Sequence, residues 1–153
     1  MLLSIATVNT VGYKLMLLLH LLAVIVAFAP AFVNPFLSAR YRKEAGGMPV
    51  DLAAKLAKGS QTVHGPALVL VGLFGFGMIG MSEKAIKFSD SWISAALLVW
   101  FIMLGVVWGL LIPAEKKVGQ GDAEAEKLVP MFGGITHLLL LIMLVIMVFQ
   151  PGR

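Results

Sequence analysis

Length, composition and charge place this chain of 153 residues among membrane proteins. Hydrophobic residues make up 59% of it and charged residues 13%, whereas soluble domains are typically about 45–50% apolar and about 25% charged. The absence of cysteine excludes disulfides, thiolate metal sites and iron–sulfur clusters. The net charge of +4 does not predict nucleic-acid binding, because the basic residues flank apolar runs, where they set membrane topology and contact anionic headgroups.

Four apolar runs follow one another, each long enough to cross the roughly 30 Å hydrocarbon core of a bilayer. The predicted spans lie near Val11–Phe36, Gln61–Met81, Trp92–Pro113 and Val129–Gln150, and none contains Asp, Glu or Arg. No long linker separates them. The sequence therefore predicts an all-α integral membrane protein, a four-helix transmembrane bundle that forms a single domain over residues 1–153 and sits in the lipid bilayer.

Helix-breaking residues and charged residues define the ends of these runs. In the first, Lys14 and the small residues of Ala27-Phe28-Ala29 imitate a signal peptide, but the run continues beyond them and predicts a retained helix. Asn34-Pro35 is expected to end or kink this helix, since the residue before proline resists the helical conformation.

The charged connections are expected to hold short helices at the membrane surface. The first such helix is expected to start near Pro49 and to stop at Gly59, with Lys55 and Lys58 reaching the headgroups. Asp122 is expected to cap a second over residues 123–128.

The distribution of lysine and arginine predicts the orientation. The first and third connections hold Arg40, Arg42, Lys43, Lys55, Lys58, Lys116, Lys117 and Lys127. The opposite side holds Lys14, Lys84, Lys87 and Arg153. This bias predicts a multi-pass protein of the cell's inner membrane with both termini outside the cytoplasm.

Two patterns concern packing. In each half a helix runs to a proline and a charged connection, and a second helix with an early histidine follows, which suggests two parallel helical-hairpin repeats. Gly105 and Gly109 form a small-xxx-small motif on the third span, and such motifs let helix backbones approach closely. This close contact would lie either within the bundle or between protomers. The interacting molecule would be a second copy of the chain, in a homo-oligomer, or a partner in a membrane complex.

The candidate binding residues are the three histidines, His20, His64 and His137. At ~1.5 Å per residue, His64 is expected about 9 Å, His137 about 15 Å and His20 about 21 Å from the face of the first connection. A pair of neutral imidazoles is suited to bind a metal ion or the axial positions of haem b. Thioethers would supply soft ligands for copper, and the candidates are Met16, Met78, Met81, Met103, Met143 and Met147.

Each of these residues also has a structural interpretation. The histidines can be neutral links between helices and the methionines can fill gaps. For methionine this interpretation is favoured, and for histidine the two are balanced. Trp100 and Trp108 lie deeper than an aromatic belt predicts and are expected to pack, with cofactor stacking as the alternative.

Two stretches carry a family resemblance. Tyr13-Lys14-Leu-Met-Leu-Leu-Leu-His20-Leu-Leu-Ala23 and Gly65-Pro66-Ala67-Leu68 resemble a family of uncharacterised bacterial four-span membrane proteins. That family looks like a distant neighbour of copper-resistance D proteins and of the HemJ-type, haem-associated protoporphyrinogen oxidase. The resemblance implies a haem or copper link for His20. The third span lacks lysine and arginine, a departure that argues against porphyrinogen oxidation.

Three functions follow as hypotheses. The favoured one is a non-enzymatic membrane protein or accessory subunit. The alternatives are a haem- or copper-binding redox protein that uses the histidines, and a transporter of a small neutral solute. The absence of acids from the predicted spans argues against proton-driven pumps and drug–proton antiporters, which retain costly intramembrane charges for function.

Overall fold

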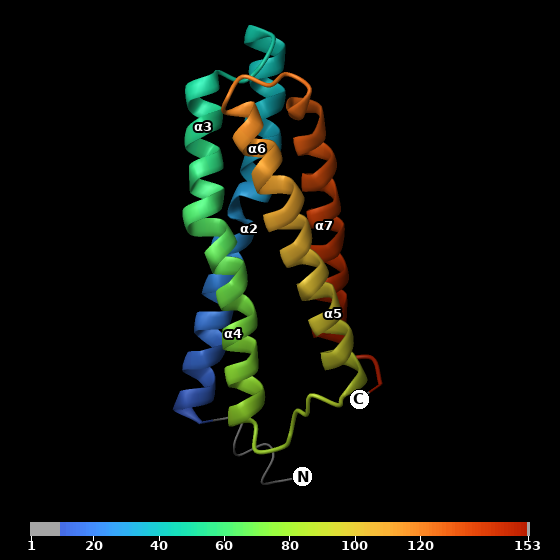
Figure 1. Ribbon diagram of the computed structural model, residues 1–153. Helices are drawn as coiled ribbons and strands as arrows, with labels where there is room; N and C mark the ends of the chain where they lie inside the picture. Colours follow the sequence, from blue (N-terminus) through green and yellow to red (C-terminus); the bar gives the residue numbers. More distant parts are fainter. Residues whose placement is uncertain (1–9, 153) are drawn as a thin grey trace.

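The computed structural model describes residues 10–152, and in that range the chain forms a four-helix bundle without strands. The elements are α2 (Val11–Ala45), α3 (Val50–Gly59), η1 (Ser60–His64), α4 (Gly65–Met81), α5 (Ser91–Val106), η2 (Val107–Leu111), α6 (Ile112–Val118) and α7 (Ala125–Phe149). Because α3, η1 and α4 are continuous, and α5, η2 and α6 likewise, they make four long rods (Figure 1). All four are long and apolar enough to cross a membrane.

The rods form two antiparallel hairpins. Figure 1 shows that α2 begins and α7 ends at the same end of the bundle. α2 packs mainly on α4, α7 packs on α5 and α6, and α3 packs on α6. Among neighbouring rods, α2 and α7 make the weakest contact. The bundle is therefore least closed between these two helices.

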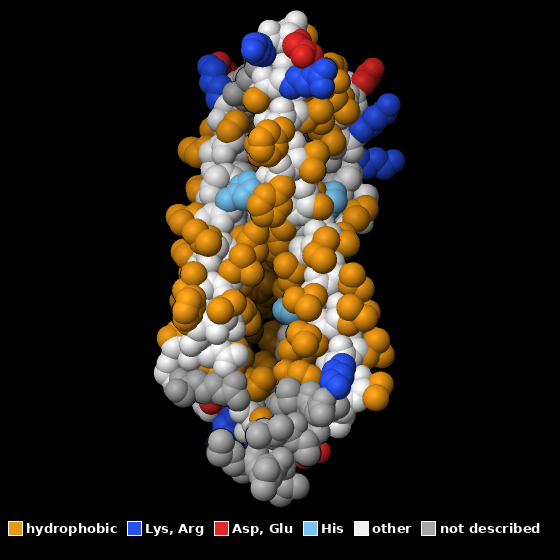
Figure 2. Space-filling model, turned by 180° about the vertical axis from the view of Figure 1, so that it is seen from behind, with side chains coloured by type: hydrophobic (Ala, Val, Ile, Leu, Met, Phe, Trp, Pro, Cys, Tyr) orange, Lys and Arg blue, Asp and Glu red, His pale blue; other side chains and the backbone are white. Residues whose placement is uncertain are grey.

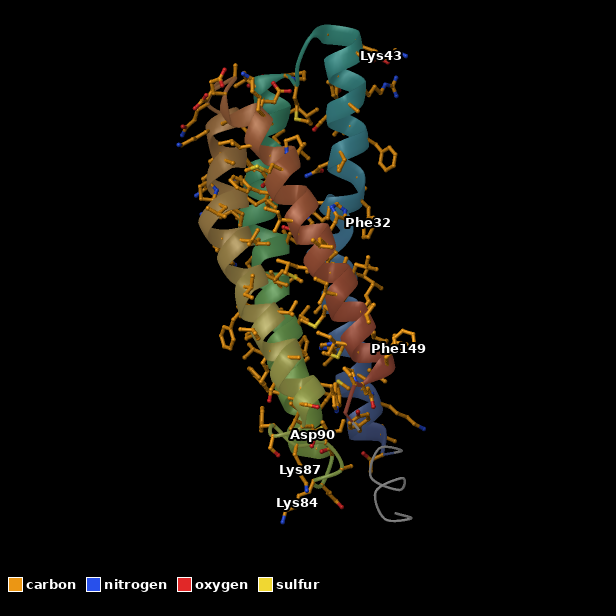
Figure 3. The ribbon with its side chains drawn as sticks, turned by 90° about the vertical axis from the view of Figure 1, so that its right-hand side faces the viewer. Phe32, Lys43, Lys84, Lys87, Asp90 and Phe149 are labelled. Carbon is orange, nitrogen blue, oxygen red and sulfur yellow. The ribbon has the colours of Figure 1, made fainter. Side chains whose placement is uncertain are left out.

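The long sides of the bundle are apolar and its ends are charged. Figure 3 shows Lys43 at one end and Lys84, Lys87 and Asp90 at the other. Between them, large apolar side chains such as Phe149, which is 76% exposed, point away from the bundle. This distribution matches a multi-pass membrane protein, whose apolar sides face lipid. Arg153, counted in the sequence prediction of orientation, lies outside the described residues.

The helices are longer than the apolar runs because they pass through prolines. α2 does not end at Asn34-Pro35 but continues to Ala45, where Gly46 in the left-handed conformation (φ 76°) terminates it. The helix start predicted near Pro49 is confirmed, since α3 begins at Val50, but the predicted stop at Gly59 is wrong, because the rod continues through η1 into α4. Asp122 Oδ1 accepts from the backbone N–H of Ala125 at 3.2 Å, as expected of a cap, but the segment that follows is the start of α7 rather than a separate short helix.

A π-helical turn precedes a proline in each of the two composite rods. η1 lies just before Gly65-Pro66, and the N–H of Gly65 donates to Ser60 C=O, five residues back. η2 lies just before Ile112-Pro113, and the N–H of Ile112 donates to Val107 C=O. A proline ring clashes with the carbonyl four residues earlier and offers it no donor. We attribute the uninterrupted helices to these wider turns, which shift the hydrogen-bond register next to each proline.

One buried cluster holds the two hairpins together at mid-length. It contains Phe28, Leu68, Trp100, Met103 and Leu140, each at most 8% exposed. Trp100 Nε1 donates to Leu68 C=O at 2.9 Å, and the ring lies where a Cβ at Gly72 would be. The absence of a side chain at Gly72 is therefore what allows the indole to pack against α4.

Candidate functional site

A cavity of about 450 Å³ lies beside this cluster, on the side of the connections 46–49 and 119–124. All four rods line it, and Phe28 and Leu68 belong both to its wall and to the cluster. The walls are mainly apolar. The polar side chains are Asn34, Ser38, Ser60, His64, Glu115, Thr136 and His137. Its size is in the range of ligand sites for small organic molecules, about 300–1,000 Å³.

The cavity is only partly enclosed. Most of its lining comes from α2 and α7, which make the weakest contact between neighbouring rods. Figure 2 shows mainly apolar side chains along one side of the bundle, with histidine side chains among them. Since this side would be surrounded by lipid, a molecule dissolved in the bilayer reaches it without crossing water.

Prolines shape the cavity wall and leave backbone carbonyl groups of α2 without their usual donors. Pro30 and Pro35 lie inside α2 and line the cavity. Pro30 deprives Val26 C=O of its usual backbone donor, four residues on. His64 replaces that donor, because its Nδ1 lies 2.7 Å from Val26 O. The imidazole thus repairs a gap in α2 that the proline causes.

The structure brings His64 and His137 to the same cavity and places His20 elsewhere. His20 Nδ1 lies 2.8 Å from Val71 O, and its ring lies against Gly75 between α2 and α4. His64 and His137 each lie roughly 20 Å along from the start of their rods, at Val50 and Ala125. The predicted order of depths placed His137 between His64 and His20. That order assumed that the apolar rods begin at Lys58 and Lys127, whereas both lysines lie inside helices that begin earlier.

Hydrogen bonds fix which ring nitrogen of each histidine is free. His137 Nδ1 lies 2.9 Å from Gly133 O, so all three histidines use Nδ1 on a backbone carbonyl. A carbonyl oxygen only accepts, and Nδ1 must therefore donate. In the neutral imidazole Nε2 then keeps its lone pair, which is the arrangement that metal-ligating histidines adopt.

Space is available next to His137. Gly133 and Gly134 line the cavity one turn before it, and no atom lies within 4 Å of the position that a Cβ would take at either residue. The glycines therefore form a recess in the wall. By contrast, Gly65 and Gly72 are filled by the rings of Trp108 and Trp100.

Glu115 was missed by sequence reasoning because its helix was expected to end at Pro113. The helix continues to Val118 and brings this carboxyl group to the cavity wall. The carboxyl is hydrogen-bonded to the hydroxyl of Ser60, while Oε2 is buried without a partner. The signal was the helix-compatible sequence Ile112-Pro-Ala-Glu115, in which proline is followed by good helix formers.

The residues fit some cofactor predictions and not others. No group of three or more His, Asp or Glu side chains in residues 10–152 is arranged to hold a metal ion. None of the six candidate methionines lines the cavity, and Met103 and Met143 pack in or against the buried cluster. Neither Trp100 nor Trp108 lines it. Two imidazoles with free Nε2 on one cavity are the kind of donor set that haem iron takes, because the porphyrin supplies the other four iron ligands.

Comparisons with protein-family models, with curated proteins and with solved structures found no match to this chain. Function is therefore inferred from the residues around the cavity.

Proposed function

We propose that this chain is a non-enzymatic membrane protein that binds a lipophilic small molecule, which enters the cavity from the bilayer between α2 and α7. The cavity of about 450 Å³ with apolar walls carries the proposal. Most of its lining belongs to α2 and α7, the neighbouring rods with the weakest contact, and an apolar molecule dissolved in lipid can enter between them without crossing water. His64 and His137 give the site a small number of fixed polar groups, as ligand pockets typically have.

Filling the recess tests this proposal. A Cβ at Gly133 or at Gly105 meets no atom within 4 Å, but only Gly133 lines the cavity, so Gly133→Leu reduces the cavity and Gly105→Leu is its control. With protein in nanodiscs of zwitterionic lipid, 4-phenylbutanol is expected to bind saturably to the wild type and to Gly105→Leu. We expect Gly133→Leu to weaken this binding at least tenfold, measured by saturation-transfer NMR against empty nanodiscs. Equal binding to the two variants would contradict the proposal.

A second candidate is haem binding, which one observation favours. His64 and His137 share the cavity and both present Nε2 as the free nitrogen. When bound, haem would supply redox chemistry and the two histidines would hold its iron. His20, which the family resemblance links to haem, does not line the cavity.

We also propose that the protein resides in the inner membrane with its N- and C-terminal ends outside the cytoplasm. The support is the excess of lysine and arginine in the helix ends that flank the connections 46–49 and 119–124.

A further inference from the structure

We infer that the cavity selects a neutral lipophilic alcohol, and that the hydroxyl group of this ligand donates its hydrogen to Nε2 of His64 or His137. This inference rests on the proposed function, since it names the class of molecule that the cavity takes. Three observations lead to it: the accessibility of the two ring nitrogens, the lack of a charged partner for an ion, and the hydrogen-bonding character of the other polar side chains.

The free nitrogens of the two histidines are accessible. Nδ1 of each ring donates to a backbone carbonyl, and in the described chain neither His64 nor His137 makes another hydrogen bond. The buried side-chain polar atoms that lack a partner in residues 10–152 are Trp92 Nε1 and Glu115 Oε2. Neither Nε2 is among them, so both of these nitrogens keep accessible surface.

Both nitrogens need a donor that the surroundings do not supply. His64 and His137 line the same cavity and lie at about the same depth, roughly 20 Å from the start of their rods. In the neutral ring Nε2 only accepts. Because lipid offers no hydrogen-bond donor, an acceptor at this depth carries a desolvation cost that a donating ligand would remove.

An ion would find no partner of opposite charge in this cavity. Among the described side chains no Lys or Arg lines it. The acid in its wall, Glu115, is bonded to Ser60, and its Oε2 is buried beyond the reach of a ligand. An unpaired ion in an apolar site costs far more free energy than a neutral polar group. The cavity therefore favours a neutral molecule.

The other polar side chains are compatible with a hydroxyl group. The hydroxyl of Thr136 already donates to Phe132 C=O at 2.9 Å, so it offers no hydrogen to a ligand. Asn34 and Ser38 line the cavity from α2 and can serve as donors or acceptors. A hydroxyl group donates and accepts, and it can bond to an imidazole and to these side chains. A ketone, ester or ether only accepts, and its oxygen would face the lone pairs of the imidazoles.

The remaining wall is suited to the hydrocarbon body of such an alcohol. Phe28, Leu68, Val107 and Leu111 line the cavity, and the first two also belong to the buried cluster. With the hydroxyl group on an imidazole, the body would lie along these side chains. Burial of the body supplies affinity in proportion to the apolar area covered, while the hydrogen bond supplies the selectivity.

A pair of probes tests the inference without any mutation. 4-Phenylbutanol and its methyl ether share one hydrocarbon body and an acceptor oxygen, but only the alcohol donates. With wild-type protein in nanodiscs of zwitterionic lipid, and empty nanodiscs to correct for partitioning, we expect the alcohol to bind at least fivefold more tightly than the ether. Equal affinities, or tighter binding of the ether, would overturn the donor inference but leave the proposed function standing. No saturable binding of either probe would overturn both.

Variants then locate the acceptor. The amide nitrogen of asparagine can replace Nδ1 of histidine as a donor to a backbone carbonyl, whereas asparagine has no acceptor at the position of Nε2. We expect the double variant His64→Asn/His137→Asn to bind the two probes with equal affinity. Circular dichroism and gel filtration check that it is folded. Full preference for the alcohol in the folded double variant would overturn the assignment to these histidines.

His20→Asn is the matched control for this experiment. His20 makes the same kind of bond, from Nδ1 to Val71 C=O, but it does not line the cavity. We expect this variant to keep the full preference for the alcohol. Loss of the preference in folded His20→Asn would overturn the assignment as well, because it would show that an imidazole outside the cavity controls the selectivity.

Discussion

The three histidines show how far local hydrogen bonding determines a residue's role. Each uses Nδ1 on a backbone carbonyl, at 2.7–2.9 Å, so the rings are alike in tautomer. What differs is the space around Nε2. His64 and His137 line a cavity, while the ring of His20 is wedged against Gly75. At this scale the surroundings, rather than the residue type, separate a candidate ligand from a link between helices.

Haem reconstitution tests that distinction. After addition of haem b to detergent-purified protein, a Soret band with the features of bis-histidine ligation is expected for the wild type and for His20→Ala. His64→Ala and His137→Ala should each remove one axial ligand, and we expect at least a tenfold loss of haem affinity. His20→Ala is a matched control, because it also deletes an imidazole bonded to a carbonyl. A wild-type protein that stays colourless, or a band lost only in His20→Ala, would refute haem ligation by the cavity histidines.

Sequence reasoning identified the histidines but could not pair them. Rarity of ionisable groups in apolar runs is visible in a sequence, and it singled out all three. Which two meet depends on where each rod starts and on how the helices are rotated about their axes, and both follow from tertiary packing. Glu115 was missed for the same reason: two residues of helix beyond Pro113 decide whether its carboxyl group faces water or the cavity.

At the scale of the element, prolines decide the shape of the helices without ending them. The sequence predicted that Asn34-Pro35 ends or kinks its helix, because the residue before proline resists the helical conformation. In the structure Pro35 and Pro66 both lie within continuous helical rods. The compensation comes from partners that a linear pattern does not show: a π-helical turn before Pro66, and the imidazole of His64 for the carbonyl freed by Pro30.

Replacing Pro30 tests this compensation. In Pro30→Ala the new backbone N–H can bond to Val26 C=O, so that carbonyl no longer depends on His64 for a donor. We expect the Nδ1–H tautomer of His64 to lose its strong preference, seen as movement of its ¹⁵N ring signals toward those of a solvent-averaged imidazole. The ring signals of His20, which bonds to Val71 C=O, should stay in place. Unchanged His64 signals would show that Pro30 does not control this histidine.

At the scale of the whole molecule, the bundle is two hairpins joined by a buried cluster at mid-length and by the contact between α3 and α6. The four-rod architecture was predictable because length and apolarity alone require helices in lipid. The position of the cavity was not predictable, since it depends on how weakly α2 meets α7. Small residues were informative only in part: Gly72 accommodates Trp100, but no atom lies within 4 Å of a Cβ position at Gly105 or Gly109, so this motif makes no close contact within the described chain.

The proposed orientation makes a prediction that suits a chain without cysteine. Lys43→Cys and Lys87→Cys place single thiols at opposite ends of the bundle, both at exposed positions (Figure 3). In intact bacterial cells, a membrane-impermeant maleimide is expected to label the Lys87 variant at least tenfold more than the Lys43 variant. After the cells are opened both should react, which shows that each thiol is accessible. This result is expected because the charge bias that sets topology favours the cytoplasm for the end with more lysine and arginine. Stronger labelling of the Lys43 variant would place that end outside the cell and contradict the proposed orientation.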